Sequence, residues 1–136
     1  MKLKYTWIIV CAIICMASSC ESNEYTSVTG IWRCTENNPY SPTIRQYEVT
    51  ISKSSSNLEN ELTIYNFHNL GDETETIIIL NSDGSFELKN GPVYLSNAYV
   101  NSGSSNVNDT FTEIGLLYSI VVNGQEYQDV EALYIR

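Results

Sequence analysis

Turn-forming residues interrupt this chain every few positions after its first part, and this punctuation constrains the fold more than any other feature. Between the turns, short segments alternate apolar and polar residues. Tyr47, Val49 and Ile51, for example, are separated by polar neighbours. A two-residue period is typical of a strand that buries one face. No window carries the sustained apolar repeat of a helix, so the sequence predicts an all-β domain.

Eight strands are predicted, joined in sequence order by short turns. Asn123-Gly124 suits the positive φ angles of a type I′ hairpin turn, and the polar segment 101–109 is predicted to be the longest loop. Closing such a sheet on itself removes both exposed edges. We therefore expect a single eight-stranded antiparallel up-and-down β-barrel, which is either filled by side chains or holds one small ligand. The predicted strands cover 28–35, 43–53, 61–67, 74–80, 85–89, 93–100, 110–122 and 125–135.

The first twenty residues have the three parts of an export signal. Lys2 and Lys4 form a basic head, residues 7–16 are mostly apolar, and small residues at 17–19 precede Cys20. Small side chains are what a signal peptidase needs before its cleavage point. The sequence therefore predicts a lipoprotein signal peptide and a lipid-modified Cys20 that anchors the chain in a membrane.

Cleavage before Cys20 divides the chain into a signal peptide at 1–19, a lipidated flexible tether at 20–27 and a barrel domain at 28–136. Removing 19 of the 136 residues leaves 117, which suits one domain. The signal takes two lysines with it, so five basic residues face sixteen acidic ones, a formal charge of −11. Nucleic acid and anionic lipid are poor partners for this chain, because no cluster of lysine or arginine is present to displace counterions from phosphates. The expected membrane contact is the lipid on Cys20.

Catalytic patterns are missing from the sequence. His68 is the single histidine, so a zinc-binding His-Glu-x-x-His motif is impossible, and no Gly-x-Ser-x-Gly elbow is present. Cys34 has no disulfide partner once Cys20 is lipidated and the signal is removed, and we expect it to be buried beside Trp32 as a small apolar residue. We expect no catalytic residue, no metal and no cofactor, and interpret the chain as not an enzyme.

Two polar groupings have simple structural explanations. Glu73 and Glu75 share one face of a predicted strand, where carboxylates usually face solvent and do not work as an acid and base pair. Asn81, Asp83 and Ser85 have the alternating oxygens of a calcium loop, but the glutamate that completes an EF-hand is missing. We interpret this second grouping as a hairpin turn.

Gly30-Ile31-Trp32 resembles the Gly-x-Trp signature of lipocalins and related calycins. Those families pack a basic residue of the last strand over the tryptophan, and Arg136 is the candidate here. The resemblance implies a barrel end closed by Gly30, Trp32 and Arg136, with a cation–π contact worth about 0.5–2 kcal/mol. The chain is also similar to small lipocalin-like surface lipoproteins of Bacteroidetes. The motifs that carry this similarity are the lipidated Cys20, Tyr47-x-Val49-x-Ile51, Asn66-Phe67-x-Asn69-Leu70-Gly71 and Ala132-x-Tyr134-x-Arg136.

Two functions fit this resemblance, which implies an outer-membrane lipoprotein facing the periplasm or the cell surface. The first is a non-catalytic binding module that holds a small apolar or glycan-like ligand, with Trp32, Tyr47, Tyr65 and Tyr118 as candidate lining. The second is a packed interaction barrel that docks to another cell-envelope protein. A hollow interior favours the first function, and a filled interior beside an exposed apolar patch favours the second.

Overall fold

Nine strands form within the described part of the chain, which covers residues 28–56, 58–108 and 110–136 of this computed structural model. The predicted signal peptide, Cys20 and the tether lie outside these residues. Within them, no helix is long and apolar enough to cross a membrane. The elements are β1 (Gly30–Asn37), β2 (Arg45–Lys53), β3 (Glu61–Tyr65), the 3₁₀ turn η1 (Phe67–Asn69), β4 (Glu75–Leu80), β5 (Phe86–Leu88), β6 (Gly91–Val93), β7 (Ala98–Val107), β8 (Glu113–Val122) and β9 (Gln125–Ile135).

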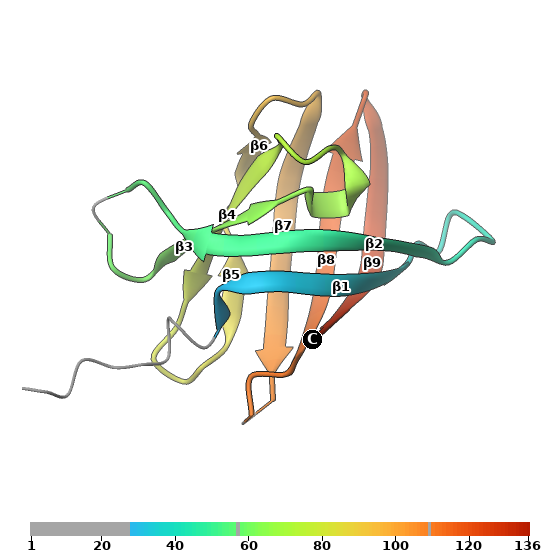
Figure 1. Ribbon diagram of the computed structural model, residues 1–136. Helices are drawn as coiled ribbons and strands as arrows, with labels where there is room; N and C mark the ends of the chain where they lie inside the picture. Colours follow the sequence, from blue (N-terminus) through green and yellow to red (C-terminus); the bar gives the residue numbers. More distant parts are fainter. Residues whose placement is uncertain (1–27, 57, 109) are drawn as a thin grey trace, which may run out of the picture.

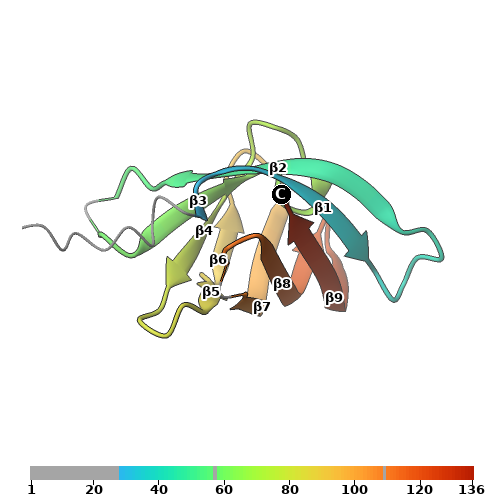
Figure 2. The ribbon, with the colours of Figure 1, turned by 60° about the horizontal axis from the view of Figure 1, so that its bottom comes forward.

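The strands form one antiparallel sheet that curls back on itself (Figure 1). Sequence neighbours pair from β1 to β5 and from β6 to β9, and β9 returns to pair with β1. A further pairing between β5 and β7 closes the circle. Figure 2 shows β1 and β2 arching over the ends of β7, β8 and β9. The predicted all-β, eight-stranded antiparallel barrel is confirmed and is consistent with a lipocalin-like architecture, with β6 as one extra strand in the described region.

β5 and β6 share one position in the barrel wall. β5 pairs with β4 and, through Glu87 and Ser104, with β7. The chain then reaches β6, which pairs with β7, while Tyr94 just beyond β6 bridges back to Glu75 at the start of β4. The run from β5 to β6 therefore lies between β4 and β7, which explains how nine described strands make an eight-stranded barrel.

The segment predicted to be the longest loop is mostly strand, because β7 continues to Val107 and pairs with β8. The prediction was wrong because the inward positions of this stretch hold Gly103 and Ser105, so no apolar alternation is visible. Small residues are needed there, since a Cβ on Gly103 would lie 2.3 Å from Leu88 Cδ1 and 2.9 Å from Tyr118 Cβ. The neighbouring strands supply the apolar contacts that β7 lacks.

Other boundaries differ from the prediction by a few residues. The strand predicted at 93–100 is divided into β6 and β7 by a turn. β1 extends to Asn37, which brings Glu36 into the barrel. The predicted turn at Asn123 and Gly124 is confirmed, with φ angles of 51° and 82°, the positive values that a type I′ turn requires.

Side chains from every described strand fill the barrel interior as one cluster. Cys34 is among them, buried as predicted. A small eight-stranded barrel is just wide enough for such a core. The bulkiest fully buried side chains include Trp32, Tyr118, Tyr134, Phe67 and Phe86.

Gly103→Ala tests the close packing of β7 against β5. The added methyl group overlaps the Leu88 side chain, and overpacking of this kind costs about 1–3 kcal/mol. Gly115→Ala on β8 is the matched control, because its Cβ would meet nothing nearer than Asn106 O at 4.0 Å. Urea unfolding should show a lower free energy of unfolding for Gly103→Ala and no loss for Gly115→Ala. An equal loss of unfolding free energy in the two variants would contradict the close packing of Gly103 against Leu88.

Candidate functional site

Trp32 and Arg136 meet at one end of the barrel. The indole Nε1 donates a hydrogen bond to Val28 O at 2.8 Å, and Arg136 Cζ lies 4.4 Å from the indole centroid. Arg136 Nε also donates to Phe111 O at 3.1 Å. Gly30 begins β1 with a φ of 131°, a conformation that glycine adopts at little cost. The structure thus places Gly30, Trp32 and Arg136 together, at cation–π distance.

A buried carboxylate, Glu36, lies further along the inner face of β1 and is 0% exposed. Arg45, its register partner on β2, donates to Oε1 from Nε at 3.0 Å and from Nη2. Oε2 accepts from the hydroxyls of Tyr47 and Tyr118 at 2.5 and 2.6 Å, and it lies 3.2 Å from His68 Nδ1. We name these five residues the Glu36 cluster.

His68 reaches the cluster from η1, where the backbone makes an unusual turn. Asn66, His68 and Asn69 have φ angles of 58°, 55° and 57°, a left-handed conformation that asparagine tolerates better than most residues. The Asn66 side chain ties the turn to β2 by donating to Glu48 O at 2.8 Å. His68 Nδ1 then lies 2.8 Å from Tyr118 OH, so the turn positions the imidazole within the barrel.

The cluster keeps Glu36 ionised. Burial by itself raises the pKa of a carboxyl group, but interactions with His68 and hydrogen bonds from Tyr118 and Tyr47 lower the pKa of Glu36 to about 2. Burial also raises the pKa of both tyrosines well above the usual value, so their hydroxyls stay protonated and donate. Burial raises the pKa of the nearby Cys34 thiol to about 12, which leaves it protonated at neutral pH.

The acceptor positions of the Glu36 carboxylate are occupied by protein donors. The cluster therefore ties four elements together, since its members come from β1, β2, η1 and β8. Arg45 is its most solvent-exposed charged group, with 34% of its side chain exposed. A carboxylate held ionised and saturated in this way is a poor general base, because it has no free lone pair for a substrate proton.

The four aromatic residues predicted to line a ligand cavity lie in three separate places. Trp32 is at the closed end, and Tyr47 and Tyr118 direct their hydroxyls at the buried carboxylate. Tyr65 is half-buried and follows the buried Ile64 on β3, so it faces outward. Trp32 and Tyr118 are 0% and 2% exposed. These two are core side chains, and the structure does not bring the four together.

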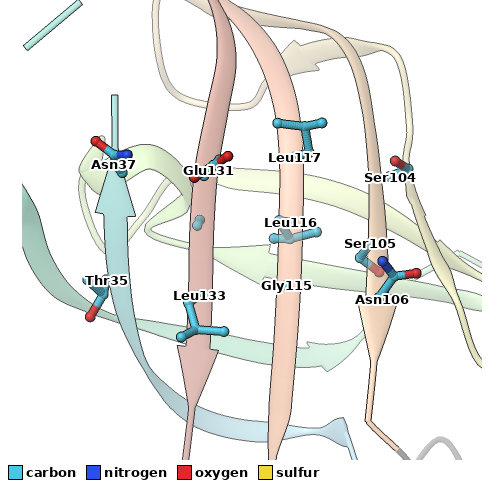
Figure 3. Close-up of a pocket in the computed structure, with 11 residues that line it drawn as sticks. Thr35, Asn37, Ser104, Ser105, Asn106, Gly115, Leu116, Leu117, Glu131 and Leu133 are labelled. Atoms are coloured by element: carbon cyan, nitrogen blue, oxygen red, sulfur yellow. The ribbon is translucent and has the colours of Figure 1, made fainter. Parts of the chain in front are cut away.

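The outer face of the barrel carries a groove of about 460 Å³ over β1, β9, β8 and β7 (Figure 3). Gly115 contributes to its depth, because the β8 backbone is bare between the side chains of Leu117 and Leu133. Leu117 is 47% exposed. The other outward residues around the groove are Thr35, Asn37, Ser104, Asn106 and Glu131.

A second groove of about 580 Å³ lies over the junction of β5 with β7 and extends across β8 to Asp129. The strands on either side of β8 are irregular here. The pairing register shows an extra residue on β7 between Val100 and Ser102 and another on β9 between Tyr127 and Val130, where Asp129 has a left-handed φ of 54°. Bulges of this kind bend a strand and redirect its side chains, which explains the hollow.

The two grooves share Ser104, Ser105 and Leu117 as lining residues, so they lie next to each other on the wall. We name the two together the outer trough. It crosses the strands from β1 to β5. Among the described residues that line it, none is lysine or arginine. Sequence reasoning missed the trough, because a hollow on a sheet depends on how neighbouring strands bend.

The calcium-like spacing of Asn81, Asp83 and Ser85 forms a hairpin turn. Asp83 Oδ1 accepts from Ser85 N at 2.9 Å and from Ser85 Oγ at 2.6 Å, so the turn uses the carboxylate itself. Across the described ranges, no group of three or more histidine, cysteine, aspartate or glutamate residues is placed to hold a metal ion.

Sequence reasoning also missed Glu36 and Arg45. The first strand was predicted to end at Thr35, one residue before the carboxylate. Trp32 and Cys34 already marked the inward positions, so extending their alternation by one step would have placed Glu36 inside. A buried carboxylate needs a paired cation, and Arg45 opens the next strand.

Glu36→Gln tests the buried charge. Because the pKa of Glu36 is lowered from 4.5 to about 2 on folding, its contribution to stability is complete above about pH 4.5 and is lost as the pH falls toward 2. The contribution is about 3 kcal/mol. The variant should lose about 2–5 kcal/mol at pH 7, since Arg45 and two hydroxyls lose their anionic partner, and its unfolding free energy should depend less on pH in this window.

Glu48→Gln on the exposed face of β2 is the matched control and should retain wild-type stability at pH 7. The residual acid response of Glu36→Gln comes from other carboxylates, such as Glu61, whose pKa Lys89 lowers through a hydrogen bond. Urea titrations between pH 2 and 7 measure these differences. An unchanged pH dependence in Glu36→Gln would contradict the assignment.

Neither a known protein-family model nor any curated protein matches this chain. The resemblance to lipocalin-like lipoproteins therefore stays a prediction carried by its motif residues. Gly30, Trp32 and Arg136 lie together in the arrangement that this resemblance implies.

Proposed function

We propose that this chain is an exported lipoprotein of the outer membrane, held by lipid on Cys20 and facing the periplasm or the cell surface. The basic head, the apolar run and the small residues before Cys20 support this proposal. A lipid anchor holds the barrel at the membrane surface and leaves its outer wall accessible to other molecules.

The barrel itself acts as a non-catalytic binding module that contacts its ligand with its outer wall. One observation carries this conclusion: side chains fill the interior, while the outer wall has a trough of ligand size. Its two grooves of about 460 and 580 Å³ fall within the range of roughly 300–1,000 Å³ common for ligand sites. The acid and base groups of the Glu36 cluster are engaged with one another, which supports a structural role for them.

Docking to another cell-envelope protein is the second candidate function. Leu117 and Ile135 are 47% and 46% exposed, and both face outward on neighbouring strands. Exposed apolar side chains that gather on one face are typical of protein contact sites. A packed interior beside exposed apolar side chains is the combination that favours this function.

Cys20→Ser tests the anchor. In a bacterial host supplied with radiolabelled palmitate, the wild-type chain should incorporate label and sediment with membranes, because Cys20 is the predicted acylated residue. The Cys20→Ser variant should do neither. Cys15→Ser is the matched control and should be labelled normally, since Ile13 and Ile14 before it are too large for the cleavage site. Label on the Cys20→Ser variant would refute the anchor.

Thiol accessibility tests whether ligands meet the wall or the interior. Cys34 is buried and its pKa is raised to about 12, so a maleimide reagent should label it only after unfolding in urea. Ser104→Cys places a thiol in the outer trough and should be labelled in the folded chain. Mass spectrometry of the labelled protein distinguishes the two sites. Rapid labelling of Cys34 in the folded protein would show an open interior and contradict the proposal.

A further inference from the structure

We propose that the outer trough binds an extended, uncharged oligosaccharide. This inference rests on the proposed function, because it names the ligand class of a module that binds through its wall. The shape of the trough, the chemistry of its lining and the unpaired polar groups within it point to the same class of ligand.

The trough is long and open. Its two grooves meet at Ser104, Ser105 and Leu117 and run across the strands from β1 and β9 to β7 and β5. A compact ligand would occupy one groove, whereas a chain of linked rings would occupy both. An open trough also lets a polymer bind along its length without needing a free end.

The lining mixes polar and apolar groups, and the charged residues among its described members are carboxylates. Asparagine and serine make up eight of the fifteen described residues around the groove at the β5–β7 junction, with Glu87 and Asp129 as its two acidic residues. Amides and hydroxyls both donate and accept hydrogen bonds, as sugar hydroxyls do. Because the described lining lacks lysine and arginine and the chain is strongly acidic, phosphorylated, sulfated and uronic ligands are disfavoured.

Several polar groups in the trough have no protein partner. Within the described residues, the side chains of Ser102, Ser104, Ser119 and Asp129 make no hydrogen bond, although all four line the groove. Ser102 and Ser119 are register partners on β7 and β8. Ser102 is exposed, and Ser119 is half-buried between two inward residues of β8. Asp129 holds a left-handed φ of 54° at the same level. These groups are free to bind the hydroxyls of a ligand.

Leu117 supplies the apolar element that a sugar site needs. A pyranose ring has hydroxyls around its edge and C–H groups on its faces, and the C–H faces pack on apolar side chains. Leu117 is 47% exposed at the junction of the two grooves, beside the bare backbone of Gly115 (Figure 3). A ring lying on Leu117 therefore has serine and asparagine side chains within reach of its edge.

A basic peptide is the competing ligand, because the trough holds carboxylates and the chain is acidic. The carboxylates are few and spread along the trough, at Glu87, Asp129 and Glu131, whereas neutral amides and hydroxyls are the more common polar groups. The lining therefore favours the uncharged sugar.

The test uses the full lipidated chain, purified in a zwitterionic detergent so that no glycoside detergent competes. Titration calorimetry measures binding of maltohexaose, cellohexaose, xylohexaose, mannohexaose and chitohexaose, with oligogalacturonate and hexalysine as charged comparisons. At least one neutral oligosaccharide should bind, and the oligogalacturonate should not. Leu117→Ala should weaken that binding by about tenfold or more, and Ser102→Ala with Ser119→Ala should weaken it further.

Leu58→Ala is the matched control, because Leu58 is 58% exposed and lies outside the trough. The Leu58→Ala variant should bind the neutral oligosaccharide with wild-type affinity, and thermal unfolding should show that all variants are folded. Absence of binding to every neutral oligosaccharide, unchanged affinity in Leu117→Ala, or binding of hexalysine alone would each overturn the inference. If one of these results is found while Cys34 stays protected from the maleimide, the oligosaccharide inference fails and the proposed binding through the wall is retained. Labelling of Cys34 in the folded chain would instead contradict the proposed function itself.

Discussion

The ionised carboxylate of Glu36, buried inside the barrel, is the constraint to which the surrounding structure is fitted. An unpaired charge at that depth would be very costly, so donors must arrive from elsewhere in the chain. Arg45 and Tyr47 come from the adjacent strand β2, Tyr118 from β8, which lies beyond β9 on the other side of β1, and His68 from the turn after β3. The left-handed backbone of that turn is explained by the need to bring His68 to this place.

The barrel interior is occupied by packed side chains, so the outer wall is the surface that a ligand can contact. Three of the aromatic residues predicted to be ligand contacts, Trp32, Tyr47 and Tyr118, are used here for packing and for hydrogen bonds to the carboxylate. Trp32 and Arg136 close one end, while the Glu36 cluster occupies the interior further along β1. The interior therefore contributes to stability, and the binding that we propose falls to the outer wall.

The wall owes its shape to departures from regular strand geometry. Gly103 lets Leu88 pack closely where β5 meets β7, and β7 and β9 each carry an extra residue that bends the strand. Gly115 leaves a bare stretch of backbone on β8. The same small and polar residues that make the middle of β7 look like a loop in the sequence also supply hydroxyl and amide groups to the trough.

Alternation and turn residues were sufficient to predict the strand class, the closed barrel and the Asn123-Gly124 hairpin, because these depend on local periods and backbone preferences. The Gly-x-Trp motif and the C-terminal arginine likewise pointed to Gly30, Trp32 and Arg136. The sequence could not place Glu36 among donors from β2, η1 and β8, or join Ser104 and Leu117 in a trough. Those neighbours are distant along the chain, and only the curling and bulging of the closed sheet brings them together.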